Sequence, residues 1–300
     1  MIKSRKVIFA LYVAVFLTSD IFTEKLKADT IPSVSLSTIS QVNQGNSYIT
    51  FPADIGNIEP LWFEANLIPN FNIRTNKESR LMGVLTSQII IRMYREYSYP
   101  VKTPSYMPQV TMYYKLCKER KNSTVFLRLA HHSNGQNGDF YTETRTINLE
   151  SGDFSTNYIE FGLIRTFFNQ NLNATQFFRS SFRADIREAD NELNGIYPEA
   201  RWKNSFSVFK IRENGNKNKP KKAGFSLKAD AELMFGDIYT RDANYFDRIN
   251  VGFTAFYTPK FFEDIGFFIN FYHGQDYYNI YFNHQLTIIR FGIMTELLRF

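Results

Sequence analysis

Hydrophobic and polar residues alternate with a period of two along most of the chain, and turns rich in Asn, Gly, Asp and Lys separate the alternating segments. Alternation of this kind is typical of β-strands that have one apolar and one polar face. Most of the segments are long enough to cross a bilayer at a tilt, which takes roughly 9 to 11 residues. About twelve strands are predicted, in the approximate ranges 47–53, 61–73, 81–97, 108–117, 124–134, 154–168, 175–186, 205–212, 225–235, 249–257, 265–272 and 285–300.

Composition decides what kind of β-protein these strands build. Aromatic residues make up 17% of the 300 residues, yet the mean hydropathy is slightly negative, and no internal apolar run approaches the ~20 residues of a membrane helix. A transmembrane barrel needs this combination, because only alternate residues face lipid. We therefore predict an all-β fold over residues 29–300, a transmembrane antiparallel up-and-down β-barrel of about 12 strands. The alternative, a soluble β-sandwich, is disfavoured by the length of the strands.

The first segment of the chain predicts export from the cytoplasm. "MIKSRKVIFALYVAVFLTS" begins with basic residues and continues with an apolar stretch, which is typical of a secretory signal peptide. We predict a signal peptide over residues 1–28, with cleavage near Ala28, and a signal anchor as the alternative. No cysteine lies near the cut to accept a lipid, and the single cysteine, Cys117, cannot form an internal disulfide.

The predicted connections give the barrel an orientation, because outer-membrane barrels keep short turns on the periplasmic side and long loops outside. The 215–224 connection is longer than its position in this alternation predicts. It carries the basic run "NGNKNKPKK", which we interpret as a solvated loop, or alternatively as a patch for anionic lipid headgroups. The net charge of +6 is modest, and nothing indicates a nucleic-acid partner. The short connections are 118–123, 169–173 and 260–264, and the long ones are 135–153, 187–204 and 237–248.

Candidate catalytic residues lie at the end of one predicted strand, in "LRLAHHSNGQNGDF". Leu127, Leu129, His131 and Ser133 share one face of this strand, and the opposite face carries Arg128. The apolar face is the lipid-facing one, so we expect His131 and Ser133 to point outward and the neighbouring histidine to point into the barrel.

The next strand, "DFSTNYIEFGLIRTFF", carries Asn157 at the head of its own apolar row. Three polar groups, His131, Ser133 and Asn157, are therefore expected to converge at the rim of a lipid-facing wall. Unpaired polar groups cost roughly 1 to 3 kcal/mol each in apolar surroundings. A serine hydrolase site would explain these three groups, with Ser133 as nucleophile, His131 as general base and the neutral amide of Asn157 orienting the imidazole. The alternative is a polar cluster within the aromatic belt.

Motifs around these residues resemble a known family. "HHSNGQ" followed by "STNYIEFGL" is similar to the H-x-S-N-G and S-x-N motifs of bacterial outer-membrane phospholipase A, and "SYMPQVTMYY" and "YHGQDYYNIYFN" resemble further segments of that family. The resemblance covers most of the chain after about residue 45. It implies a twelve-stranded barrel in the bacterial cell outer membrane that hydrolyses the acyl esters of phospholipids as a phospholipase A1/A2. It further implies a catalytic triad of His131, Ser133 and Asn157.

The resemblance also implies calcium as cofactor and a homodimer whose calcium sites lie at the subunit interface. When this sequence is aligned with the motifs of the family, the implied metal ligands are a backbone oxygen of Gln136 and the side chain of Ser98 from the partner subunit. The interval from Ser133 to Asn157 is about twice that of the family, so the second ligand of this loop does not align. Asp153 stands near its place, and Asp139 is a weaker candidate.

Two functions follow from this pattern. The first is a calcium-dependent phospholipase A. The second is a non-catalytic, porin-like or structural barrel whose lumenal charged residues line a channel. We expect mutual pairing of these charges instead, because about twelve strands leave a narrow lumen. The charged residues expected in the lumen are Arg92, Arg128, Glu160, Arg183, Lys228 and Glu232.

Overall fold

The computed structural model describes residues 34–50, 55, 61–116, 122–211, 222–239, 245–262 and 264–295. The predicted signal peptide, Cys117 and most of the basic run lie outside these ranges. The described residues all belong to one unit that begins at Ser33. Among them, no helix is both long and apolar enough to span a bilayer.

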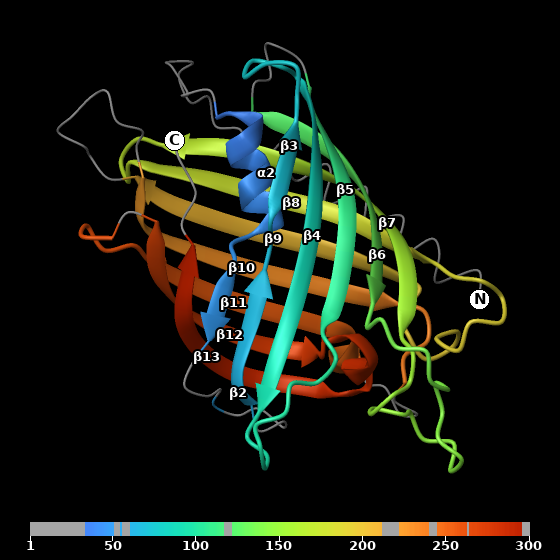
Figure 1. Cartoon of the computed structure of the whole chain (residues 1–300). Helices are drawn as coiled ribbons and strands as arrows, with labels where there is room; N and C mark the ends of the chain where they lie inside the picture. Colours follow the sequence, from blue (N-terminus) through green and yellow to red (C-terminus); the bar gives the residue numbers. More distant parts are fainter. Residues whose placement is uncertain are drawn as a thin grey trace. The chain divides into compact units, whose positions relative to one another are not determined.

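The alternating segments form strands close to their predicted positions (Figure 1). The strands are β1 Tyr48–Thr50, β2 Leu61–Leu67, β3 Asn70–Ile73, β4 Leu81–Tyr94, β5 Ser105–Lys115, β6 Ser123–Ser133, β7 Ser155–Asn169, β8 Ala174–Ile186, β9 Ala200–Ile211, β10 Ala223–Phe235, β11 Ile249–Tyr257, β12 Ile265–Gln275 and β13 Gln285–Thr295. One α-helix, α2 Leu36–Gln44, and two 3₁₀ helices, η1 Tyr245–Arg248 and η2 Asn279–Asn283, complete the described elements.

Antiparallel pairing closes these strands into a ring. From β4 to β13 each strand pairs with the next in sequence, β13 pairs with β1, β1 with β2, and β2 with β4. Twelve described strands thus close the barrel, and β3 pairs with β4 beside the ring. The predicted fold class is confirmed. The single strand predicted over 61–73 is divided at Pro69, because proline has no N–H to donate to the ladder.

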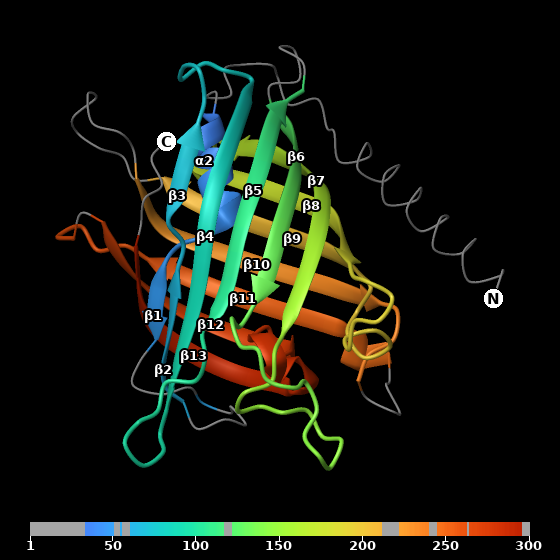
Figure 2. The same cartoon turned by 45° about the vertical axis from the view of Figure 1, so that its right-hand side comes forward.

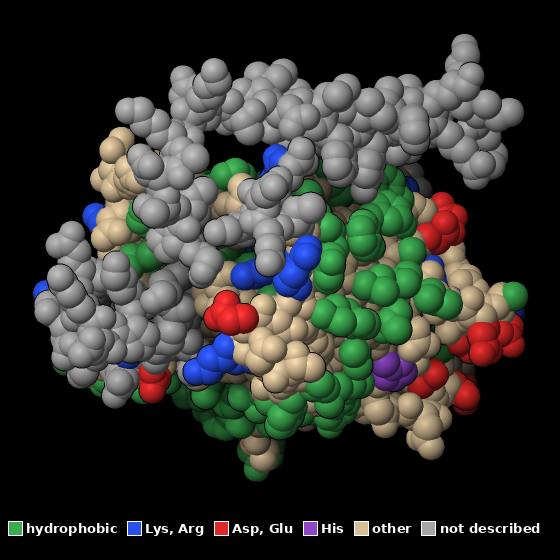
Figure 3. Space-filling model, turned by 90° about the horizontal axis from the view of Figure 1, so that it is seen from above, with side chains coloured by type: hydrophobic (Ala, Val, Ile, Leu, Met, Phe, Trp, Pro, Cys, Tyr) green, Lys and Arg blue, Asp and Glu red, His purple; other side chains and the backbone are tan. Residues whose placement is uncertain are grey.

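The two faces of the sheet differ as the alternation predicts. On β6, Leu127 and Leu129 are 40% and 54% exposed, whereas the intervening Phe126 and Arg128 are 1% and 8% exposed. Hydrophobic side chains cover a broad area of the face seen in Figure 3. An apolar outer wall and a polar interior are what a barrel in lipid requires.

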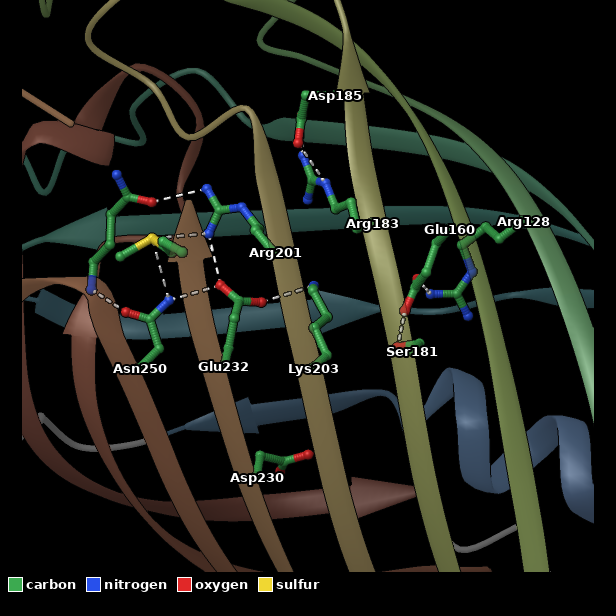
Figure 4. Close-up of polar contacts among 12 residues, drawn as sticks. Arg128, Glu160, Ser181, Arg183, Asp185, Arg201, Lys203, Asp230, Glu232 and Asn250 are labelled. Carbon is green, nitrogen blue, oxygen red and sulfur yellow. Dashed lines mark hydrogen bonds and ion pairs between the residues drawn. The ribbon is translucent and has the colours of Figure 1, made fainter. Parts of the chain in front are cut away.

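Ion pairs occupy the lumen, and Figure 4 shows part of this network. Glu160 accepts hydrogen bonds from Arg128 at 3.1 Å and from the Ser181 hydroxyl at 2.7 Å. Glu232 pairs with Arg201 at 2.6 Å and with Lys203 at 3.0 Å. All six charged residues expected in the lumen form ion pairs with other side chains, namely Arg92, Arg128, Glu160, Arg183, Lys228 and Glu232.

The most deeply buried of these networks joins strands that are distant in sequence. Glu64 on β2 and Arg92 on β4 are both fully buried and are 2.8 Å apart. Arg290 on β13 lies 2.6 Å from the same carboxylate, and Arg92 also pairs with Asp276 at 2.7 Å. Two tyrosine hydroxyls donate to Glu64 as well. Each buried charge therefore has a partner of opposite charge.

Helix α2 lies inside the barrel near the end where the short β3–β4 turn is found (Figures 1 and 2). Ser35 caps it by accepting a hydrogen bond from the Thr38 N–H at 3.1 Å. Leu36 and Ile39 pack into an apolar cluster with lumenal side chains of β4 to β10, and Asn43 donates to the Tyr113 hydroxyl at 2.7 Å. The sequence pattern does not predict this helix, which fills part of the lumen.

The long loops pack together at the opposite end of the barrel. Phe140 and Phe154 of the β6–β7 loop share an apolar cluster with Leu193 and Tyr197 of the β8–β9 loop and with Phe282 of η2. Because this cluster is buried, the described parts of these loops pack against one another and against η2.

Candidate active site

The ends of β6 and β7 bring the predicted site residues side by side. In the antiparallel register, His131 stands opposite Asn157, and Ser133 stands opposite Ser155. The inward row next to them is buried, with His132 at 5% exposure and Thr156 at 2%. His131 and Asn157 therefore share the outer wall, at the end of the barrel that carries the long loops.

A hydrogen bond joins the two residues across the strands. His131 Nδ1 lies 2.9 Å from Asn157 Oδ1. An amide oxygen can only accept, so this bond requires the proton to be on Nδ1. The lone pair of His131 Nε2 is then available to accept a proton, which is the tautomer that a general base needs.

Ser133 lies two residues beyond His131 on the same face of β6. On its other side it stands opposite Tyr106 of β5. Among the residues the structure describes, the Ser133 hydroxyl is not hydrogen-bonded to the imidazole. The structure thus joins two of the three predicted residues and sets the third beside them. Such contacts are often long in ligand-free enzymes and tighten when substrate binds.

The adjacent histidine has a different environment. His132 points into the barrel, where its Nε2 lies 3.1 Å from the Ser105 hydroxyl. Its ring packs edge-on against Phe154, with 4.9 Å between the centroids. The ring is buried against the β6–β7 loop and has no access to the outer wall.

Asn134, directly after the serine, has a structural role that the sequence did not reveal. Its Oδ1 accepts hydrogen bonds from the backbone N–H groups of Gln136 at 3.2 Å and Phe154 at 3.0 Å. Its Nδ2 donates to the Gly152 carbonyl at 2.9 Å. One buried amide therefore ties the beginning of the β6–β7 loop to its end, which holds Ser133 and Asn157 at the same level. An asparagine directly after the serine is the only sequence signal for this role.

The predicted metal ligands lie in two different loops, Gln136 and Asp153 between β6 and β7 and Ser98 between β4 and β5. The side-chain amide of Gln136 donates to the Thr103 hydroxyl, and the backbone N–H of Asp153 donates to the Gly138 carbonyl at 3.0 Å. Ser98 lies in the β4–β5 loop with a φ of 67°. Among the described residues, no group of three or more His, Cys, Asp or Glu side chains is placed to hold a metal ion.

The chemistry of the donors nevertheless fits calcium, which prefers carboxylate, carbonyl and hydroxyl oxygens and needs no histidine or cysteine. Partial burial raises the pKa of Asp153 above its usual range, and the nearby carboxylate of Glu192 raises it further. A raised pKa means that negative charge is disfavoured at this position. A cation bound next to Asp153 would offset the negative charge of its carboxylate.

Comparison with solved structures bears on this arrangement, although no family model and no curated protein matches the sequence. Outer membrane phospholipase A from Escherichia coli aligns with a TM-score of 0.56 and 12% identity, over 88% of this chain and 99% of that chain. The barrel has the fold of outer membrane phospholipase A.

Two further structures share this fold at 12% identity. One is an active-site mutant of the Escherichia coli enzyme with an asparagine replaced by alanine, which gives a TM-score of 0.53 over 92% of this chain and 95% of that chain. The other is the Salmonella typhi outer membrane phospholipase dimer with bound calcium, which gives a TM-score of 0.52 over 91% and 94%. At this level of identity the likeness establishes the fold.

Proposed function

We propose that this protein is a phospholipase A of the bacterial outer membrane that hydrolyses acyl ester bonds of phospholipids with a Ser-His-Asn triad. The observation that carries the proposal is the hydrogen bond between His131 and Asn157 on the outer wall, next to Ser133. The shared fold with outer membrane phospholipase A supports it, as do the sequence motifs around the three residues.

In the proposed reaction, the Ser133 hydroxyl attacks the acyl carbonyl while His131 Nε2 takes its proton. His131 then gives this proton to the leaving lysophospholipid oxygen, which frees the product and leaves an acyl-serine. Water, deprotonated by the same nitrogen, hydrolyses the acyl-serine and restores the enzyme. Asn157 holds the Nδ1 proton in place throughout, so that Nε2 remains the reactive nitrogen.

The position of the site on the outer wall suits a membrane substrate. A phospholipid reaches His131 and Ser133 by lateral diffusion in the bilayer, with its acyl chains against exposed side chains such as Leu129 and Phe161. A neutral asparagine suits this surface better than an aspartate, because an ionised carboxylate loses more solvation energy next to hydrocarbon.

Calcium is the proposed cofactor. When bound, the cation would polarise the ester carbonyl and offset the charge of the oxyanion. Gln136 and Asp153 of the β6–β7 loop would hold it together with the partner subunit's Ser98, so that the active form is a homodimer. Asp139 is an additional candidate from the same loop.

The location follows from the same proposal. Residues 1–28 would direct export, and the barrel would insert in the outer membrane with its long loops outside. A porin-like channel, the rival function, has less support, because ion pairs such as Arg201–Glu232 and the helix α2 occupy the lumen.

The test is a lipase assay of the purified protein in detergent micelles that contain phospholipid, with calcium or with chelator. We expect calcium-dependent release of fatty acid, and losses of at least about 1000-fold in Ser133→Ala and His131→Ala. Two matched controls are Ser155→Ala, which changes an exposed serine opposite Ser133, and His273→Ala. His273 is a histidine of the sheet hydrogen-bonded to the neighbouring strand at 2.7 Å. Full activity in Ser133→Ala would refute the proposal.

A further inference from the structure

A second feature of the long-loop end lies next to the candidate active site. A cavity of about 200 Å³ is bounded by the β4–β5 loop, the two ends of the β6–β7 loop and η2. Its lining includes Lys102, Thr103, Gln136, Glu150 and Tyr281. Apart from Gln136, a proposed calcium ligand, none of these residues has a role in the proposed acyl transfer, and the cavity is polar where the wall below it is apolar.

The cavity is close to Ser133 along the chain, and its lining includes Asn134, the residue directly after the serine. Gln136, in its lining, is three residues beyond Ser133, and an extended chain advances ~3.3 Å per residue. Gln136 therefore lies within roughly 10 Å of the nucleophile. Thr103, which accepts the Gln136 amide, precedes the strand whose Tyr106 stands opposite Ser133. In the proposed orientation the long loops lie outside the hydrocarbon, so the headgroup of a phospholipid whose ester reaches Ser133 would lie at the level of these loops.

The cavity carries one cationic and one anionic side chain that are available to a ligand. Lys102 is half-buried, and its Nζ lies 5.8 Å from the centroid of the Tyr94 ring. Glu150 is exposed at the rim. In the part of the chain that the structure describes, neither side chain is in an ion pair.

The backbone that carries both charges is held by η2 and the residue before it. The Asn279 amide donates to the Thr103 carbonyl at 2.9 Å, and the Tyr278 hydroxyl donates to the Lys102 carbonyl at 3.3 Å. The Tyr281 hydroxyl donates to the Leu149 carbonyl at 3.5 Å. The backbone at Lys102 and directly before Glu150 is therefore held by hydrogen bonds that do not involve the two charges, as in a preorganised binding site.

We propose that this cavity binds the headgroup of the phospholipid substrate and favours a zwitterionic headgroup with a phosphate and a primary ammonium, as in phosphatidylethanolamine. Lys102 pairs with the phosphate, and Glu150 pairs with the ammonium. The inference rests on the proposed phospholipase function, and it adds a headgroup preference to the acyl-ester chemistry.

The test measures binding separately from hydrolysis. Short-chain phosphatidylethanolamine and phosphatidylglycerol are titrated into the detergent-solubilised Ser133→Ala protein, in calcium and in chelator, with folding checked by circular dichroism. In this background, Glu150→Gln is expected to weaken phosphatidylethanolamine binding about tenfold and to leave phosphatidylglycerol binding unchanged. Lys102→Gln is expected to weaken both. The matched controls are Glu143→Gln and Arg145→Gln, charged residues of the same loop outside the cavity lining, which should change neither.

Three results would overturn the headgroup assignment: equal affinity of the unsubstituted cavity for both lipids, equal effects of Glu150→Gln and Glu143→Gln, or an effect of Glu150→Gln that disappears in chelator. The last would mean that Glu150 acts through the metal. Hydrolysis by the native protein is assayed in parallel. Hydrolysis without headgroup dependence refutes the cavity's role alone, whereas selective binding without any hydrolysis refutes the phospholipase and leaves a lipid-binding site.

Discussion

The bond between Asn157 and His131 offers a sharp test, because it is the one contact of the proposed triad that the structure contains. Replacing Asn157 by alanine removes the acceptor 2.9 Å from His131 Nδ1. Asn157 is exposed at the end of β7, so the substitution leaves no cavity in the protein. The barrel is expected to fold normally.

The size of the effect follows from the charge that the imidazole acquires. A hydrogen bond to a charged group contributes about 1.5 to 3 kcal/mol, compared with about 1 kcal/mol for a neutral pair. In the proposed reaction His131 becomes positively charged when it takes the serine proton, so the larger value applies to the transition state. A factor of ten in rate corresponds to about 1.4 kcal/mol, which gives a fall in kcat of roughly 10- to 150-fold. The exposure of Asn157 to solvent favours the lower half of that range.

The assay is steady-state hydrolysis of a micellar phospholipid in calcium, with kcat and KM determined separately. KM is expected to stay within about twofold, because a bond that strengthens only in the transition state does not bind substrate. Asn157→Asp keeps an acceptor at the same position and should recover most of the lost rate. The reasoning is refuted if Asn157→Ala retains full kcat, or if Asn157→Asp is as slow as Asn157→Ala while both variants remain folded.

Further predictions concern the barrel itself. Glu64→Ala leaves two buried arginines without their shared carboxylate, so chemical unfolding should show a loss of about 3 to 5 kcal/mol. Gly162→Ala would bring a Cβ to 2.5 Å from the Phe126 ring, whereas a Cβ at Gly83 meets nothing closer than 3.7 Å. Thermal unfolding should therefore show a loss of about 1 to 3 kcal/mol for Gly162→Ala and little change for Gly83→Ala. Deleting residues 34–45 removes the helix from the lumen, and planar-bilayer recordings should show a larger conductance than for the full chain. An unchanged conductance would mean that the ion pairs alone seal the barrel.

The alternation of the sequence predicted most of the fold, because it reports directly which residues face lipid and which face the lumen. It placed His131 and His132 on opposite faces, as the structure has them. It could not predict α2, since that helix is short and its polar residues are satisfied by distant side chains such as Tyr113. The division at Pro69 could have been predicted, because proline interrupts a central strand.

The candidate site could likewise be predicted only in part. The sequence shows which face of its strand each of these residues occupies. The register that sets His131 opposite Asn157, however, depends on how the β6–β7 loop folds. That loop is tied together by Asn134, and its conformation follows from contacts with other loops. Ser98, Gln136 and Asp153 lie in loops, so alternation carries no information about where their oxygens point.

Covalent labelling of the proposed nucleophile, Ser133, tests the central claim most directly. A long-chain alkylsulfonyl fluoride partitions into micelles and transfers its sulfonyl group to an activated serine oxygen with loss of fluoride. Mass spectrometry of the labelled protein is predicted to find the adduct on Ser133, with Ser155 unmodified and little label on Ser133 in the His131→Ala variant. An unmodified Ser133, or equal labelling with and without the imidazole, would contradict the proposal that this barrel is a serine hydrolase.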